Sequence, residues 1–147
     1  MKLTVKLAPL FILISLCLCF AGCLGEYGAE AQKNAERERF SAMLGFGLEP
    51  LELVSEDYSA DFQGWGHYSL VYDLNGSDIA IEPGGDWSDE NPAPREVDAL
   101  ASRNGLRIYA EEDWHYIWFY REEDARHKYS ALYDTETGLL YLYLNKM

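Results

Sequence analysis

Cysteine is scarce in this sequence, and its placement narrows the chemistry available to the chain. Cys17, Cys19 and Cys23 are the only three, and none follows residue 23. A domain built from the remaining residues therefore has no intramolecular disulfide, no cysteine zinc site and no cysteine nucleophile if Cys23 is modified. Its stability has to come from packing, and all 11 tyrosines and 4 tryptophans lie after residue 22 to supply a core.

Basic residues are also few, with 12 Lys and Arg against 25 Asp and Glu. After residue 22 the balance is 25 acidic against 10 basic residues, a formal charge of −15. Because phosphate contacts dominate affinity for nucleic acid, this balance excludes a nucleic-acid partner. It also opposes lying flat on anionic lipid, but it is compatible with a basic partner or bound cations.

Familiar catalytic motifs are missing. The chain has no Gly-rich phosphate loop, no Gly-x-Ser-x-Gly elbow and no His-Glu-x-x-His. Residues 73–78 superficially resemble a calcium loop, but their glycine is fourth rather than sixth and Gly84 occupies the twelfth position. We therefore favour a non-enzymatic protein without a cofactor.

The amino-terminal 22 residues have the pattern of an export signal. Lys2 and Lys6 precede an apolar run from Leu7 to Phe20, which has the length of a signal-peptide core. The sequence Phe20-Ala21-Gly22-Cys23 follows, and it resembles the bacterial lipobox, with Phe in place of the usual Leu. Two other readings are an uncleaved membrane helix over residues 7–24 and an ordinary secretory peptide cut near Gly22.

The lipobox resemblance implies a lipoprotein with acyl chains on Cys23. It would then be anchored at the extracytoplasmic face of a cell membrane, with the outer membrane an option in a Gram-negative cell. Two or more acyl chains give durable anchoring, since each buried CH₂ contributes about 0.8 kcal/mol. The resulting organisation is a signal peptide at 1–22, a lipidated tether at 23–31 and a single domain at 32–147.

Hydrophobic periodicity predicts the elements of that domain. A helix is expected at Glu30–Leu44, a short strand at Leu51–Val54, irregular chain at 57–66 and a second helix at Pro94–Asn104 with Gly105 after it. Strands are expected at 67–74 and 78–82 around the turn signal Asn75-Gly76, and at 106–110, 114–121, 129–133 and 139–145. A five-residue loop would join the last two.

These elements predict an α+β fold. It would contain a single antiparallel sheet of about five or six strands, two helices on the same face and a carboxyl-terminal meander.

Asp57, Asp61 and His67 are the strongest polar cluster, with His115 a further candidate. Carboxylates beside imidazole can bind a metal ion or perform acid–base catalysis. The competing interpretation is that the aspartates cap loops, His67 satisfies a backbone group and His115 packs in the sheet. We favour this structural interpretation and predict no metal site.

Aromatic residues form two further candidate binding surfaces. Tyr129, Tyr133, Tyr141 and Tyr143 would share one face of the terminal hairpin, where they would bind a ligand if exposed or stabilise the sheet if a helix covers them. A second set beside glycines comprises Trp65, His67, Trp87 and Trp114. Of these residues, the possible binding residues are Trp65, His67, Tyr141 and Tyr143.

The segment from about residue 57 to 145 resembles a group of small uncharacterised bacterial proteins and lipoproteins. The matching features are an Asp-rich loop at 61–67, Trp87 with the helix ending near Leu100, the aromatic strand at 116–120 and the hairpin from Ala131 to Tyr143. This loop has one histidine where such proteins tend to have two. The resemblance implies the fold but no activity.

The sequence thus predicts a membrane-anchored exported lipoprotein that binds an envelope protein or a cell-wall component. The alternative is a small hydrolase, metal-dependent or acid–base, using Asp57, Asp61 and His67.

Overall fold

The computed structural model describes residues 28–61, 65–110 and 113–147. Cys23, the predicted signal peptide and most of the predicted tether therefore lie outside the described residues. The described chain up to Arg39 belongs to one compact unit, and the chain from Phe40 onward belongs to a second. The second unit contains the sheet and every candidate site residue except Cys23.

The first described element is helical over residues 28–44. Two i,i+3 ion pairs predicted from the sequence are present, Lys33 with Glu30 at 2.8 Å and Arg39 with Glu36 at 3.8 Å. The helix begins at residue 28, two residues before the predicted start at Glu30. Gly45, with φ of +82°, ends the helix as predicted.

No helix within the described residues is long and apolar enough to cross a membrane.

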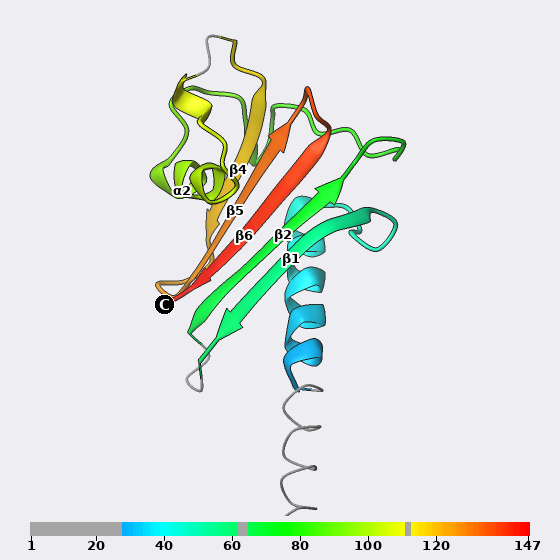
Figure 1. Ribbon diagram of the computed structural model, residues 1–147, viewed down its shortest axis with the longest axis vertical. Coiled ribbons are helices and arrows are strands. Elements are labelled where there is room, and N and C mark those ends of the chain that lie inside the picture. The colour runs from blue at the N-terminus through cyan, green and yellow to red at the C-terminus, as the bar shows by residue number, and fades with distance from the viewer. Residues whose placement is uncertain (1–27, 62–64, 111–112) are drawn as a thin grey trace, which may run out of the picture. The chain divides into compact units, whose positions relative to one another are not determined.

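A six-stranded antiparallel sheet forms the body of the second unit (Figure 1). Its spatial order is β1-β2-β6-β5-β4-β3, so the last three long strands form a meander. The long strands are β1 (Glu52–Ala60), β2 (Gly66–Asp73), β4 (Tyr116–Glu122), β5 (His127–Asp134) and β6 (Leu139–Lys146), and β3 (Trp87–Ser88) is short. With helix α2 (Arg95–Arg103), this confirms the predicted α+β fold.

The first face of the sheet carries the larger hydrophobic core. Side chains at alternate positions of the four central strands pack here with Phe40 and Leu44 from the end of the first helix. Leu48 and Leu51, from the connection to β1, complete this core. Phe40 packs edge-to-face on Tyr129, with ring centroids 5.3 Å apart.

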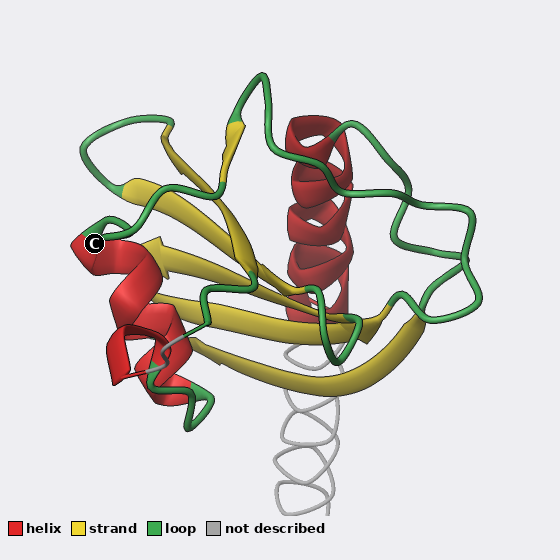
Figure 2. Cartoon of the chain, turned by 90° about the horizontal axis from the view of Figure 1, so that it is seen from above, coloured by secondary structure: helices red, strands yellow, loops and turns green. Residues whose placement is uncertain are grey.

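The second face is covered by α2, which lies against one side of the sheet (Figure 2). Val97, Leu100 and Ala101 of α2 pack on the strand residues Tyr116, Leu132 and Tyr141, among others. Because Phe40 and Leu44 pack on the first face, the prediction that both helices share one face is wrong. Residues of β2, β5 and β6 are buried on both faces, by α2 on the second face and by Phe40, Leu44 and Leu48 on the first.

Helix α2 matches its predicted range closely, with Pro94 and Asn104 as its caps. At its end the Gly105 N–H donates to the Ser102 carbonyl, and the Leu106 N–H donates to the Ala101 carbonyl. These two bonds define a Schellman motif, which needs the left-handed φ of +76° found at Gly105. The local sequence therefore fixes where α2 stops.

Three predicted strand assignments are wrong. β1 runs through Asp57 to Ala60, which were assigned to irregular chain, and it is exposed along nearly all its length. Because neither of its faces is buried, it carries no apolar alternation to detect. Residues 78–82 form no strand, since both edges of β2 are already paired with β1 and β6. Residues 106–110 include a 3₁₀ turn, η1 (Ile108–Ala110), in place of a strand.

The β5–β6 hairpin has a loop one residue shorter than predicted. Asp134 pairs with Leu139, leaving four residues at 135–138 in the turn. A one-residue change of register exchanges the two faces of a strand, because side chains alternate with a period of two. This single difference decides where the terminal tyrosines lie.

Candidate functional site

Tyr141 and Tyr143 lie under α2 on the second face, opposite Leu132 and Ser130 of β5. Each is only 7% exposed, so they do not form an open aromatic strip. Tyr129 and Tyr133 lie on the first face, opposite Leu144 and Leu140. The predicted grouping of the four tyrosines is therefore wrong, and the alternative, that a helix covers Tyr141 and Tyr143, describes them correctly.

The side chains on the second face change from apolar to polar along the strands. One row across the sheet is apolar or aromatic, and it runs from Val71 through Tyr141 and Leu132 to Trp118. The next two rows, toward the β1–β2 turn, are largely polar. They form what we call the polar strip, which comprises Asp57, His67, Ser69, Lys128, Ser130, Tyr143 and Asn145.

Asp57 and His67 are in direct contact at one end of the polar strip. The His67 Nε2 lies 2.8 Å from Asp57 Oδ2, and the two side chains are diagonal neighbours on adjacent strands. The His67 ring also stacks on Tyr143, with centroids 6.1 Å apart. The sequence therefore identified a real pair, although it placed Asp57 in a loop rather than in a strand.

Asp61 does not join this pair. Its Oδ1 accepts a hydrogen bond from the Trp65 backbone N–H at 2.9 Å, and its own N–H donates to the Trp65 carbonyl at 2.8 Å. Asp61 thus closes the β1–β2 turn, as the structural interpretation predicted.

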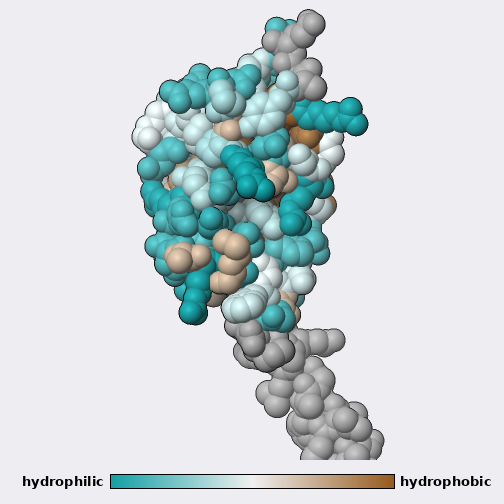
Figure 3. All heavy atoms as spheres, turned by 90° about the vertical axis from the view of Figure 1, so that its left-hand side faces the viewer, coloured by the Kyte–Doolittle hydropathy of each residue, from teal (hydrophilic) through white to brown (hydrophobic). Residues whose placement is uncertain are grey.

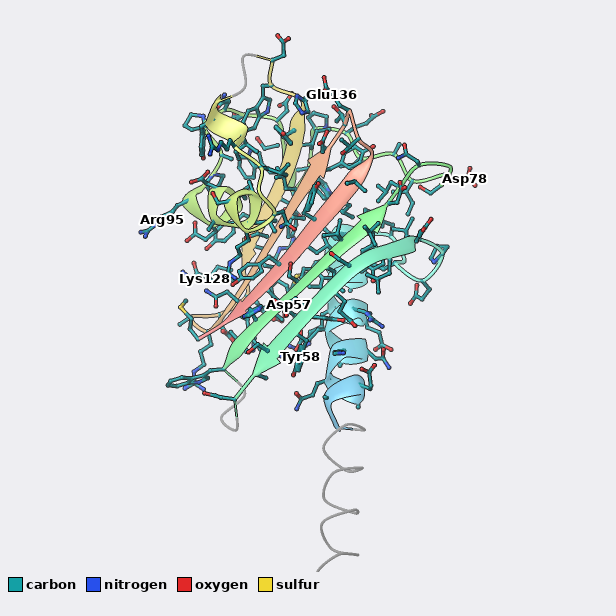
Figure 4. The ribbon with its side chains drawn as sticks, viewed as in Figure 1. Asp57, Tyr58, Asp78, Arg95, Lys128 and Glu136 are labelled. Carbon is teal, nitrogen blue, oxygen red and sulfur yellow. The ribbon has the colours of Figure 1, made fainter. Side chains whose placement is uncertain are left out.

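His115 lies at the opposite end of the sheet from His67. It precedes Tyr116, which pairs with Asp134, whereas His67 is in register with Asn145 and Lys128. Its Nε2 lies 3.6 Å from Asp134 and 3.8 Å from Glu136. Figure 4 shows the same separation, with Asp57 and Lys128 toward one end and Glu136 toward the other. The hypothesis that His115 joins the Asp57 cluster is therefore wrong.

The described residues 28–61, 65–110 and 113–147 contain no group of three or more His, Cys, Asp or Glu side chains arranged to hold a metal ion. The weak metal candidates reduce to the single pair Asp57–His67, because Asp61 is engaged in the turn.

The set of Trp65, His67, Trp87 and Trp114 does not form one cluster. Trp65 is 54% exposed at the β1–β2 turn, next to His67. Trp87 packs on Phe119 on the first face, and Trp114 packs on Tyr116 on the second. Only Trp65 and His67 are neighbours.

Arg103 was not among the predicted site residues, yet it lies at the centre of the polar strip. It comes from the last turn of α2, and its Cζ is 4.7 Å from the centre of the Tyr143 ring. Two hollows flank it, of about 120 Å³ and 250 Å³. The smaller reaches Ser130, Tyr143 and Asn145, and the larger reaches Asp57, Ser69 and Asn104.

Burial raises the pKa of Tyr143 above its usual value, an effect that the Arg103 cation opposes and the Asp57 carboxylate reinforces. Burial likewise raises the pKa of Tyr141, with a smaller contribution from Asp134. Both phenols are therefore neutral across the physiological range and are available as hydrogen-bonding or stacking groups.

Sequence reasoning missed Arg103 because a basic residue in the last turn of a helix is common and interacts favourably with the helix dipole. Only the crossing of α2 over β6 distinguishes it from Arg95 or Arg107.

Comparison with known proteins gives no relative. No family model matches the chain, no curated protein matches it, and no solved structure matches it.

Proposed function

We propose that this chain is an exported lipoprotein, held at the extracytoplasmic face of a membrane by lipid on Cys23, that binds an envelope protein or a cell-wall component. The observation that carries the binding function is the polar strip with its two hollows, which α2 leaves open at one end of the second face. The lipid anchor is supported by the sequence Phe20-Ala21-Gly22-Cys23 and the apolar run before it.

The character of the surface supports recognition through polar groups. On the side that carries α2, hydrophilic residues dominate and apolar ones are scattered (Figure 3). The large exposed apolar side chains among the described residues include Leu53 and Val54 of β1 and Trp65 beside the polar strip. A partner would therefore meet mainly hydroxyl, amide and charged groups, with Trp65 as an aromatic contact at the rim.

Crosslinking and co-purification of the full chain from native membranes would test this function. The wild type should retain a stoichiometric partner, and Ser69→Arg, which fills the larger hollow, should lose it. Ser102→Arg is the matched control, since it adds the same side chain to an exposed position of α2 outside both hollows. Equal retention by wild type and Ser69→Arg in folded preparations would reject the polar strip as the binding site.

The anchor has its own test. Cys23→Ala should lose the lipid mass and move from the detergent phase to the aqueous phase. An unchanged mass and partition would reject lipidation at Cys23.

A hydrolase is the second candidate, favoured by the 2.8 Å contact between Asp57 and His67. A carboxylate that orients an imidazole is a common acid–base arrangement. Within the described residues, however, no hydroxyl is hydrogen-bonded to the His67 ring to serve as a nucleophile. Hydrolysis that disappears in His67→Ala but persists in His127→Ala would favour the enzyme over the binding module.

A further inference from the structure

The smaller hollow beside α2 brings together groups that suit one kind of ligand. It lies between α2 and the strands β5 and β6, with a volume of about 120 Å³. This space exceeds what a single water needs, and it accommodates a small polar group. Its lining includes Arg103, Lys128, Ser130, Tyr143, Asn145 and Glu96.

The guanidinium of Arg103 is held in place by the Tyr143 ring, and no carboxylate of the described residues forms an ion pair with it. Its Cζ lies over that ring, 4.7 Å from the ring centre. Stacking on an aromatic ring occupies the face of a guanidinium and leaves its N–H groups at the edge available. Among the described residues, Arg103 is therefore a cation whose N–H groups remain available to an anionic ligand.

Ser130 supplies an independent observation. It is 2% exposed, it lines the hollow, and the described residues provide no hydrogen-bond partner for its hydroxyl. The hydroxyl is open to the hollow, so a polar group there can reach it and hydrogen-bond with it. Since the hydroxyl lines the hollow, a ligand oxygen or a water molecule in the hollow would supply that partner.

The surrounding charge favours a monoanion. Lys128 also lines the hollow, but Glu96 at 3.9 Å and Glu122 at 3.6 Å offset its charge, so Arg103 is the cation that remains for a ligand with one negative charge. The net charge of the whole chain is −13, so a dianionic phosphate would meet stronger long-range repulsion than a carboxylate. A planar carboxylate also matches the fork of a guanidinium.

We propose that this hollow binds the carboxylate group of a ligand, with Arg103 donating from its guanidinium edge and Ser130 donating from its hydroxyl. This inference rests on the proposed binding function and names the ligand chemistry at that site. The Asn145 side-chain amide lines the same hollow and provides a further donor.

Titration of the full chain in detergent micelles with sodium acetate, followed by NMR, would test the proposal. Saturable shifts are expected for the backbone amides of Ser130, Tyr143 and Asn145, and acetamide, a neutral mimic, should give none. Arg103→Gln should raise the acetate Kd at least about tenfold, because hydrogen bonds to charged groups are the strong ones. Ser130→Ala should raise it by about threefold.

Arg107→Gln is the matched control. It removes the same charge from an exposed arginine that lines neither hollow beside Arg103, and it should change the acetate Kd less than twofold. If both arginine variants change the acetate Kd equally, the binding depends on net charge and not on the hollow, and the proposal is overturned. Equal binding of acetamide, or tighter competition by inorganic phosphate than by acetate, would also overturn it.

The outcome separates this proposal from the proposed function. One result is a captured partner that is lost in Ser69→Arg and retained in Arg103→Gln. This result would support the proposed binding function and reject the carboxylate site. Saturable acetate binding without any captured partner would establish the site and reject the protein-binding form of the function.

Discussion

The two faces of the sheet differ in how completely they are buried. On the first face, apolar and aromatic side chains from four strands pack with Phe40, Leu44 and Leu48 along the central strands. On the second face, α2 covers only part of the sheet, and the polar strip occupies the rest. The contrast teaches that the larger core lies on the first face and that polar side chains remain accessible where α2 does not cover the second.

The largest expected effect tests the first face. Leu142→Ala removes a fully buried side chain from the central strand β6 and should lower the free energy of unfolding by about 2–5 kcal/mol. Urea unfolding monitored by tryptophan fluorescence gives the value. A loss below about 1 kcal/mol would mean that the first face relaxes around the cavity and is not the main source of stability.

A smaller effect is expected at the end of α2, on the second face. Gly105→Ala places a Cβ on a residue with φ of +76°, which costs about 1–2 kcal/mol. The space around this position is open, so strain in the backbone is the only penalty. Thermal unfolding of Gly105→Ala beside Gly76→Ala, which has φ of +80° in a loop, should show similar losses, and an unchanged Gly105→Ala would contradict the Schellman assignment.

The buried phenols of the second face predict a decline of stability in alkali. Because the folded-state pKa of Tyr141 and Tyr143 is raised, both states hold the proton below pH 10 and no stability is lost there. Above pH 10 the unfolded chain ionises first, so the stability falls as pH rises toward the folded-state pKa. Tyr143→Phe should reduce this decline in a urea-unfolding series between pH 9 and 11.5. An identical pH dependence in wild type and Tyr143→Phe would show that Tyr143 ionises freely when folded.

The smallest effect should come from the polar strip itself. Ser69→Ala in the larger hollow removes a hydroxyl that contributes no apolar contact, and the free energy of unfolding should change by about 0.5 kcal/mol or less. The same urea titration as for Leu142→Ala provides the measurement. A loss comparable to that of Leu142→Ala would erase the distinction between the two faces.

The sequence predicted the elements that contribute buried side chains to the two cores. Helix α2, β2 and β6 were recognisable because residues of one kind recur with the period of each structure, and β4 because it is apolar on both faces. β1 was cut short because its residues are exposed, and residues 78–82 alternate like a strand although β2, the strand before them in the chain, is already paired on both edges.

The candidate site was less predictable because it depends on tertiary placement. The Asp57–His67 pair was anticipated, since both residues lie near one turn of the chain. Arg103 and Ser130 lie far apart in sequence and meet only because α2 crosses β5 and β6. The terminal tyrosines were assigned to the wrong faces because the predicted hairpin loop was one residue too long. Residue propensities do not determine loop length to one residue.

The features of β1 affect whether copies of the protein associate through their sheet edges. It is an edge strand, yet a register shift between Leu53 and Ser55 interrupts its regularity, and it carries Glu52, Glu56 and Asp57. Bulges and charged side chains are the devices that prevent edge strands from joining into larger sheets. On the proposed membrane anchor, the protein would diffuse in two dimensions at high local density. These features would keep neighbouring molecules separate where a flat, apolar edge would seed lateral aggregation.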